Sequence, residues 1–474
     1  MNIIGRTAEL DQIQQCLHSG RPEFLVLYGR RRVGKTYLIR NHFRDRFAFY
    51  ATGIANEKNA KQLQAFHDSL KRYGHPEKKA PSDWIEAFSR VRDILEEEGV
   101  IRDTESGRRV IFLDELPWMD AARSDFKAAL DYFWNSFASA KPDILLIVCG
   151  SAASWIINNI LTNTGGLYNR VTRRIHLKPF SLHECEAFFQ AMNLPASGQT
   201  VLESYMVFGG IPHYLNLLDR RLSLSQNIEQ LCFSPTGELR DEFDLLFRSL
   251  FRHAEKHVAI IEKLAEKRSG FLRTEIAKVP AIGDGEPLTK ALKELEQCGF
   301  IRKYRNFTKQ KNGCFFRLID PFTLFWLKFR RNGMKTAWTD YVGTPGYYAW
   351  CGNAFELVCL LHIDQIKQAL GIAGIGCDVF AWRSSGTSPG AQIDLLIDRR
   401  DNVINLCEMK YTENAFSIDA SYEKELRNKR AVFTEETKTK KATVLTLITM
   451  NGLKNNMYAG IVDRELTADD LFLK

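Results

Sequence analysis

In the first 180 residues, short apolar runs alternate with longer stretches in which apolar positions recur every three or four residues. The runs lie at Glu23–Tyr28, Val110–Leu113 and Ile144–Cys149. Continuous runs of this kind are typical of parallel strands, which are buried on both faces. The longer stretches predict helices at Asn59–Arg72, Ser82–Glu98 and Phe126–Ala140, and a further strand is expected at Ile175–Leu177 before a helix that begins at Ser181. Strands separated by helices predict an α/β domain with a doubly wound parallel sheet.

The middle of the chain has a different pattern. Amphipathic helices are expected at His257–Lys267, Arg273–Val279 and Pro287–Cys298. A hairpin of Phe300–Arg305 and Phe315–Leu318 around Asn312-Gly313 follows. Three helices and a hairpin predict a winged helix-turn-helix, in which the third helix enters the DNA major groove. The side chains that could contact phosphates are Lys290, Lys293, Arg302, Lys303, Arg305, Lys309 and Lys311. Because such domains also serve as lids or dimer modules in larger proteins, both interpretations stay open.

A second hairpin is predicted near the C-terminal end. Its strands are Gln392–Asp398 and Val403–Tyr411. A turn centred on Asp401 sets Asp394 opposite Glu408, since both lie seven residues from it. Alternation along the strand then places Lys410 on the same face as Glu408. In the helix expected at residues 422–433, Lys429 and Arg430 face either a DNA backbone or solvent.

Composition and charge narrow the class of protein. The chain has 474 residues, of which 45% are hydrophobic and 26% charged, as in a soluble globular protein with room for about three domains. Neither a long apolar span nor a signal peptide is present, so we expect a cytoplasmic protein without a membrane partner. Ten cysteines without a C-x-x-C pair predict reduced, mostly buried thiols. The net charge of +8 permits nucleic-acid binding.

Residues 29–36 carry the most specific chemistry in the chain. They read GRRRVGKT, a P-loop between a predicted strand and a predicted helix. The predicted ATP-binding residues are Gly29, Arg30, Arg31, Arg32, Val33, Gly34, Lys35 and Thr36. The glycines permit a tight turn around phosphate, Lys35 would reach the β- and γ-phosphates, and Thr36 would bind Mg²⁺. The three arginines could equally be solvated surface.

Residues after the next predicted strands supply the other groups that an ATPase needs. Asp114 would orient the Mg²⁺ shell and Glu115 would activate the attacking water as a general base. Ser151, after the third strand, is expected beside the γ-phosphate as a sensor. Arg170 is the favoured arginine finger among Arg170, Arg173 and Arg174, although all three could be surface charges or contact nucleic acid. A finger acting in trans would require an oligomer.

Five motifs in order resemble the prokaryotic ATPase family described mainly from archaea, a branch of the AAA-like and STAND-type P-loop ATPases. They are Gly5-Arg6-x-x-Glu9-Leu10, GRRRVGKT, the Leu113–Glu115 acids, Cys149-Gly150-Ser151 and Gly209–Leu215 (GGIPHYL). The resemblance implies that Arg6 and Glu9 lie near the adenine and that Pro212 belongs to a lid that senses the nucleotide. Asn169 stands where relatives often have glycine, which leaves the role of Arg170 open.

The C-terminal hairpin resembles the PD-(D/E)xK nuclease core, although the spacing alone is a weak signal. Asp394 matches its aspartate, Glu408-Met409-Lys410 its E-x-K, and Glu356 the glutamate of its first helix. Asp394 and Glu408 would hold Mg²⁺, while Lys410 would stabilise developing charge during phosphodiester hydrolysis. Gln392 stands where relatives often have glutamate. A nuclease-like domain follows the ATPase in many relatives of the same family.

Together these features predict four domains. They are a P-loop ATPase at residues 1–180, a helical lid at 181–250, a winged helix-turn-helix at 251–335 and an α/β restriction-endonuclease-like domain at 345–474. The predicted function is an ATPase whose nucleotide state controls a Mg²⁺-dependent DNA nuclease, with genome defence as the setting that the resemblance implies. The alternative is a regulator that binds DNA or protein without cleaving it. DNA is the expected partner, and a protein trigger and a homo-oligomer are open alternatives.

Overall fold

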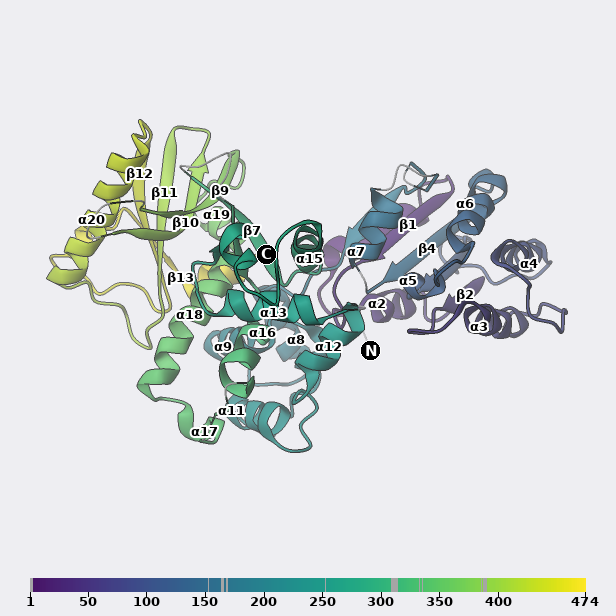
Figure 1. Cartoon of the computed structure of the whole chain (residues 1–474), viewed down its shortest axis with the longest axis horizontal. Helices are drawn as coiled ribbons and strands as arrows, with labels where there is room; N and C mark the ends of the chain where they lie inside the picture. Colours follow the sequence, from purple (N-terminus) through teal and green to yellow (C-terminus); the bar gives the residue numbers. More distant parts are fainter. Residues whose placement is uncertain are drawn as a thin grey trace. The chain divides into compact units, whose positions relative to one another are not determined.

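The computed structural model describes the chain except residues 1–2, 152, 163–165, 168, 252, 308–313, 332, 335, 385 and 387–389. Lys309, Lys311 and the predicted turn at Asn312-Gly313 therefore lie outside the described residues. The chain forms two compact units, residues 1–179 and 180–474 (Figure 1). No helix in the described part of the chain is long and apolar enough to cross a membrane. All ten cysteines are unpaired and eight of them are buried, as predicted.

The first unit is built on five parallel strands in the order β2-β3-β4-β1-β5. These strands are β1 (Glu23–Tyr28), β2 (Phe49–Thr52), β3 (Arg109–Asp114), β4 (Ile144–Gly150) and β5 (Arg173–His176). The predicted parallel sheet is confirmed. The apolar pattern misses only β2, because this four-residue edge strand is half buried and has no continuous apolar run.

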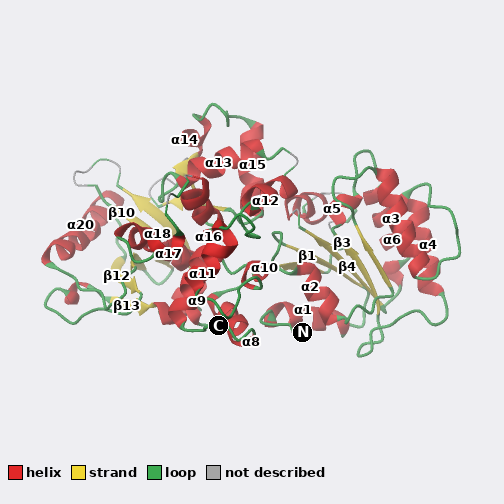
Figure 2. Cartoon of the chain, turned by 90° about the horizontal axis from the view of Figure 1, so that it is seen from below, coloured by secondary structure: helices red, strands yellow, loops and turns green. Residues whose placement is uncertain are grey.

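Helices cover both faces of this sheet. They are α1 (Thr7–Leu17), α2 (Lys35–His42), α3 (Asn59–Arg72), α4 (Trp84–Glu96), α5 (Leu116–Met119), α6 (Phe126–Ser136) and α7 (Ala153–Ile156). Figure 2 shows α3, α4 and α6 grouped on one side of β3 and β4. Their aromatic side chains, among them Phe66, Trp84 and Phe126, are fully buried in one core with the apolar residues of the strands. Burying each such ring contributes about 1.5–3 kcal/mol, so this face holds the sheet and the ends of its strands in place.

The second unit contains one sheet of eight strands in the order β13-β12-β11-β10-β9-β7-β8-β6. These strands are β6 (Phe271–Leu272), β7 (Ile301–Asn306), β8 (Cys314–Leu318), β9 (Cys377–Arg383), β10 (Gln392–Arg399), β11 (Val403–Lys410), β12 (Ala442–Thr449) and β13 (Arg464–Thr467). β9, β10 and β11 form an antiparallel meander, and β12 returns parallel to β11 after helix α20 (Ala420–Thr437). Leu426, Val432 and Phe433 of α20 pack on this part of the sheet.

The elements predicted for a winged helix occur in the expected order. They are α13 (Glu255–Ala265), α14 (Arg273–Ala277), α15 (Glu286–Gln297) and the antiparallel pair of β7 and β8. β7 also pairs in parallel with β9, where Arg305 lies opposite Phe380. The hairpin after α15 and the C-terminal hairpin therefore belong to one continuous sheet. The assignment as a winged helix and the division into four domains stay predictions.

Further helices complete the second unit. They are α8 (Leu182–Ala191), α9 (Gly198–Phe208), α10 (Pro212–Leu215), α11 (Leu224–Ile228), α12 (Glu242–Leu250), α16 (Pro321–Phe325), α17 (Trp338–Tyr341), α18 (Pro345–Leu361) and α19 (Ile363–Ala369). α8 begins as predicted, after Ser181, whose side chain forms a capping box with Glu184. Gly209 and Gly210, both with positive φ, separate α9 from α10.

A buried histidine joins the start of α8 to the end of α18. The Leu182 N–H donates to Nε2 of His362 at 3.0 Å, and Nδ1 of His362 donates to the Val358 carbonyl at 2.8 Å. Burial lowers the pKa of His362 to about 4. The unfolded chain, with a histidine pKa of about 6.5, therefore binds more protons than the folded chain below that pH.

We expect this difference to reduce the free energy of unfolding of the second unit by about 3 kcal/mol as the pH falls from about 6.5 to about 4. Urea denaturation of the parent and of His362→Gln at several pH values measures this contribution, because glutamine does not titrate. The variant should lose less stability than the parent over this range. Parallel losses in both proteins would show that His362 does not contribute to the acid sensitivity.

Candidate functional site

The P-loop lies between β1 and α2, where its two glycines adopt backbone angles that other residues avoid. Gly29 has a φ of 154°, and a Cβ atom there would lie 2.2 Å from the Leu177 carbonyl oxygen. Gly34, with a φ of 91°, is the N-cap of α2. The loop can therefore turn tightly at the N-terminus of α2, whose free N–H groups favour a phosphate.

Lys35 is folded back onto the loop. Its side chain is 4% exposed, and Nζ donates to the Arg30 carbonyl at 2.8 Å. Arg30 is buried, Arg31 is exposed and Arg32 is half buried with a positive φ. The three arginines thus have different environments and do not form one solvated surface.

Three strand ends bring the other predicted ATPase residues together. Because β4 lies between β1 and β3, Ser151 after β4 is next to the acids after β3. Thr36 Oγ1 donates to Asp114 Oδ2 at 2.8 Å, and Ser151 Oγ donates to Glu115 Oε1 at 2.7 Å. Burial raises the pKa of Asp114, and the charge of Glu115 raises it further. A hydroxyl and a buried carboxylate side by side are ligands that Mg²⁺ prefers.

Arg6 has a role in the structure that its motif does not reveal. Its guanidinium is buried and donates to the carbonyls of Val33 in the P-loop, at 3.1 Å, and Lys178, at 2.8 Å. Glu9 lies 3.8 Å from it. Arg6 therefore connects the P-loop to the segment that follows β5. The Gly5-Arg6 motif identifies the residue in the sequence but does not predict these two contacts.

Two predicted ATPase residues are not brought to the P-loop by any contact within the described chain. Arg170 is exposed, and its side chain makes no hydrogen bond or ion pair with another described residue. Pro212 is the first residue of α10, in the second unit. The roles of Arg170 as a finger and of Pro212 as a nucleotide sensor stay predictions.

The register of the C-terminal hairpin is the one that the turn at Asp401 predicts. Leu395 lies opposite Cys407 and Leu396 opposite Leu406, and the same register continued by one position sets Asp394 opposite Glu408. Opposed Cβ atoms in such a pair are about 5 Å apart. This register predicts neighbouring carboxylates just beyond the last paired residues of the hairpin.

Glu356 of α18 is held by two arginines. It is 4% exposed and forms ion pairs with Arg317 of β8 and, at 3.1 Å, with Arg268. Burial raises the pKa of Glu356; the arginines oppose this shift and the charge of Asp394 adds to it. Glu356 and Asp394 are therefore close enough for their charges to interact.

Glu408 has a cationic partner that the sequence did not predict. Lys429 Nζ of α20 lies 2.9 Å from Glu408 Oε2 and 3.0 Å from Glu425 Oε1, with only 16% of its side chain exposed. Burial raises the pKa of Glu408, and Lys429 opposes this shift. The prediction that Lys429 faces DNA or solvent is therefore wrong, because α20 packs this residue against the sheet. Arg430 pairs with Asp463 and is also not a free surface charge.

Lys410 and Asp394 each contact a neighbouring side chain. Lys410 Nζ lies 4.5 Å from the centre of the Tyr422 ring of α20. The amide of Gln392 donates to Asp394 Oδ1 at 2.6 Å, so the residue that departs from the family pattern supports the aspartate. Lys410 and Glu408 thus share the face of β11 that α20 covers, as the strand alternation predicts.

The four predicted nuclease residues come together in part. Burial raises the pKa of both Glu356 and Glu408, and the charge of Asp394 adds to both shifts. Among the described residues, however, no group of three or more histidine, cysteine, aspartate or glutamate side chains is arranged to hold a metal ion. The opposed pair of Asp394 and Glu408 remains, and Mg²⁺ is often bound by one or two carboxylates together with substrate phosphates.

The basic residues of the predicted DNA-binding region fall into two groups. Lys290 and Lys293 of α15 and Lys303 and Arg305 of β7 are exposed. Arg302 is half buried, and its guanidinium donates to the Leu360 carbonyl at 2.8 Å. Arg302 therefore stabilises the end of α18.

Comparison with known proteins identifies the first part of the chain. The profile of an ATPase domain found predominantly in Archaea matches residues 3–218. An uncharacterized protein of Methanocaldococcus jannaschii is 24% identical over 335 residues, which cover 69% of this chain and 68% of that protein. Among solved structures, the Walker-type ATPase of Pyrococcus abyssi is 20% identical with a TM-score of 0.48, over 69% of this chain and 96% of that one. The ORC2 protein of Aeropyrum pernix is 14% identical with a TM-score of 0.41, over 69% and 94%.

The match to residues 3–218 includes the P-loop, both acids after β3 and Ser151. The chain therefore carries an ATPase domain of the archaeal type, as predicted. The matched segment ends before the eight-stranded sheet and does not include the C-terminal hairpin or its acids.

Proposed function

We propose that this chain is an ATP-controlled DNA nuclease, in which the ATPase domain regulates a Mg²⁺-dependent site on α18, β10 and β11. The observation that supports the proposal is the register of β10 and β11, which continued by one position brings Asp394 opposite Glu408, with Lys410 on the same face as Glu408. A setting in genome defence is part of the proposal and rests on the family resemblance alone.

In the ATPase domain, Lys35 would exchange the Arg30 carbonyl for the β- and γ-phosphate oxygens of ATP. Thr36 and Asp114 would hold Mg²⁺, which neutralises phosphate charge. The Ser151 hydroxyl now donates to Glu115. When Ser151 turns to the γ-phosphate, Glu115 is released to accept a proton from the attacking water.

The connection between the two units supports control by nucleotide. The Leu177 N–H donates to the Tyr28 carbonyl at 2.8 Å, directly before the P-loop, and the Leu177 carbonyl touches Gly29. Three residues later, the Phe180 N–H donates to the Gly210 carbonyl beside Pro212. A change in the P-loop on nucleotide binding would therefore act directly on the segment that enters the second unit.

At the nuclease site, Asp394 and Glu408 would hold the metal, which lowers the pKa of bound water and neutralises charge on the phosphodiester. Gln392 keeps Asp394 in position through its hydrogen bond. The ammonium of Lys429 lies on Glu408 where a bound cation would replace it. Lys410 would donate to the phosphate oxygen on which charge develops.

A regulator that binds DNA or protein without cleaving it is the second candidate. The observation that favours it is the neutralisation of both glutamates: Glu356 by Arg317 and Arg268, and Glu408 by Lys429. These pairs would stabilise the fold of a nuclease-like domain that no longer binds metal.

Incubation of the purified full chain with supercoiled plasmid and with single-stranded DNA distinguishes the two candidates. The reactions contain Mg²⁺, Mn²⁺ or a chelator, each with ATP, ADP or no nucleotide. We expect cleavage that requires the metal and whose rate differs at least about five-fold between ATP and ADP, a regulatory coupling of about 1 kcal/mol. Intact DNA under every condition would refute the nuclease and leave the regulator.

A further inference from the structure

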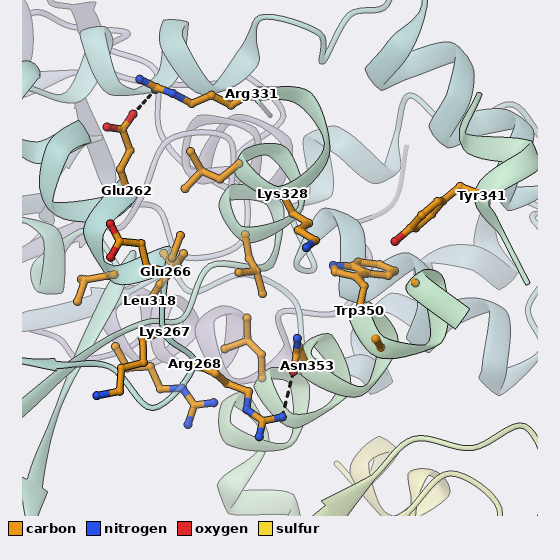
Figure 3. A pocket seen from close by; sticks show the side chains of 18 residues that line it. Glu262, Glu266, Lys267, Arg268, Leu318, Lys328, Arg331, Tyr341, Trp350 and Asn353 are labelled. Carbon is orange, nitrogen blue, oxygen red and sulfur yellow. Dashed lines mark hydrogen bonds and ion pairs between the residues drawn. The ribbon is translucent and has the colours of Figure 1, made fainter. Parts of the chain in front are cut away.

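The second unit contains a cavity of about 700 Å³ whose lining does not include Asp394 or Glu408 (Figure 3). Its walls are the end of α13, β8, the helical turn Trp326–Arg331 and α18. This volume lies within the range of pockets that hold small organic ligands. The cavity belongs to no part of the ATPase domain, and the roles proposed above do not use it.

The lining combines positive charge with an apolar floor. The cationic side chains are Lys267, Arg268, Arg317, Lys328 and Arg331. Only Glu262 and Glu266 are acidic, and they pair with Arg331 and Lys263, respectively. Leucine side chains and the indole of Trp350 form the apolar part. Such a lining suits a ligand with an anionic group and a planar apolar ring.

Two donors in the pocket lack partners within the described chain. Trp350 is 5% exposed, and its buried Nε1 has no hydrogen-bond acceptor. Figure 3 shows this nitrogen at the end of the indole ring that is nearer the side chain of Lys328. Lys328 is exposed and forms no ion pair with a described residue. Leaving a buried N–H unsatisfied is costly, so an acceptor in the cavity would stabilise this arrangement.

The same pocket reaches the glutamate of the proposed nuclease site. Arg268 and Arg317 line the cavity, and both also bind Glu356. Arg268 is half exposed and hydrogen-bonds to Asn353 at its other side. An anion in the cavity would therefore compete with Glu356 for these two guanidinium groups.

We propose that this cavity binds a small aromatic anion, through Lys328 and the Trp350 N–H, and that its occupancy weakens the ion pairs that hold Glu356. Binding itself is independent of the proposed nuclease activity. The consequence that ligand binding frees Glu356 for the cleavage site rests on the proposed function.

Naphthalene-1-sulfonate is a suitable probe, since it has one anionic group and a planar ring and is not a nucleotide. Isothermal titration of the full chain compares it with sulfate, which lacks the ring, and naphthalene-1-methanol, which lacks the charge. We expect the sulfonate to bind at least about ten-fold more tightly than either, because only it meets both parts of the lining.

Variants of the two donors test the location. Trp350→Phe keeps the ring but removes the N–H, and Lys328→Ala removes the charge; each should weaken sulfonate binding at least about five-fold. Lys290→Ala, at an exposed lysine of α15, is the matched control and should bind as the parent does. Equal affinity of all four proteins for the sulfonate, or no binding at all, would refute the proposal that this cavity binds an aromatic anion.

Glu356→Gln tests the competition without any measurement of cleavage. Glutamine keeps the shape of the side chain but removes its charge, so Arg268 and Arg317 should become available to the anion. We expect the sulfonate to bind at least about three-fold more tightly to this variant, with a circular dichroism spectrum like that of the parent. Unchanged or weaker binding to the folded variant would refute the link to Glu356. If the sulfonate binds as expected and the parent cuts no DNA, the proposed anion-binding cavity is supported and the proposed nuclease activity is refuted.

Discussion

Replacement of Lys35 by alanine is expected to weaken ATP binding at least about 100-fold and to abolish ATP hydrolysis. The ammonium of Lys35 is buried in the P-loop and donates to the Arg30 carbonyl of the same loop. Charge-assisted hydrogen bonds contribute about 1.5–3 kcal/mol each, and contacts to two phosphates make this loss one of the largest from a single side chain.

The fold should survive this change, because the sheet is held by the aromatic core that α3, α4 and α6 form with the strands, and Lys35 is not part of that core. Titration with ATP and a coupled phosphate assay measure binding and hydrolysis, and thermal unfolding followed by circular dichroism verifies the fold. Lys58→Ala, at an exposed lysine before α3, is the control and should behave as the parent. Parent-like ATP affinity in a folded Lys35→Ala protein would refute the P-loop assignment.

A second test in the same domain separates chemistry from binding. Glu115→Gln should retain ATP affinity while hydrolysis falls at least about 100-fold, since glutamine cannot accept the proton of the attacking water. It can still accept the hydrogen bond of Ser151, so the strand ends should keep their arrangement. Any loss of activity should therefore appear in kcat.

The sequence predicted those parts of the fold that depend on neighbouring residues. β1, β3 and β4 are continuous apolar runs, and the helix at Asn59–Arg72 has the predicted bounds. The pairing of Asp394 with Glu408 could also be predicted, because a short turn fixes the register of a hairpin. β2 and β9 are only partly buried, so their apolar patterns are too weak to mark them.

Contacts between distant segments could not be predicted in this way. Glu356 is 39 residues from Arg317, and Glu408 is 21 residues from Lys429. No local period links such pairs, and their formation depends on how α18, α20 and the sheet pack together. The parallel pairing of β7 with β9 is another long-range contact. The acids of the candidate nuclease site were therefore visible in the sequence, whereas the cations that hold two of them were not.

The largest effect in the second unit is expected for Asp394→Asn. Asparagine has the size of aspartate and can still accept the hydrogen bond of Gln392, so the hairpin should keep its register. The variant removes one of the two opposed charges that would hold Mg²⁺. We expect metal-dependent DNA cleavage to fall at least about 100-fold, because the activated water and the neutralised phosphate both depend on the metal.

Asp398→Asn is the matched control, since Asp398 lies on the same strand but pairs with Lys441 at 2.5 Å, away from Glu408. It should cleave DNA at the parent rate. Thermal unfolding with and without Mn²⁺ adds a readout that does not require activity, because a metal that binds only the folded chain raises its melting temperature. The parent and Asp398→Asn should show this rise, and Asp394→Asn should not.

If Mn²⁺ stabilises Asp394→Asn as much as the parent, the metal is bound elsewhere and the acids of β10 and β11 are structural. If Mn²⁺ raises the melting temperature of the parent but the parent cuts no DNA, the acids bind a metal without catalysing cleavage. The ion pairs of Glu356 with Arg317 and Arg268, and of Glu408 with Lys429, would then explain a domain held in an inactive state.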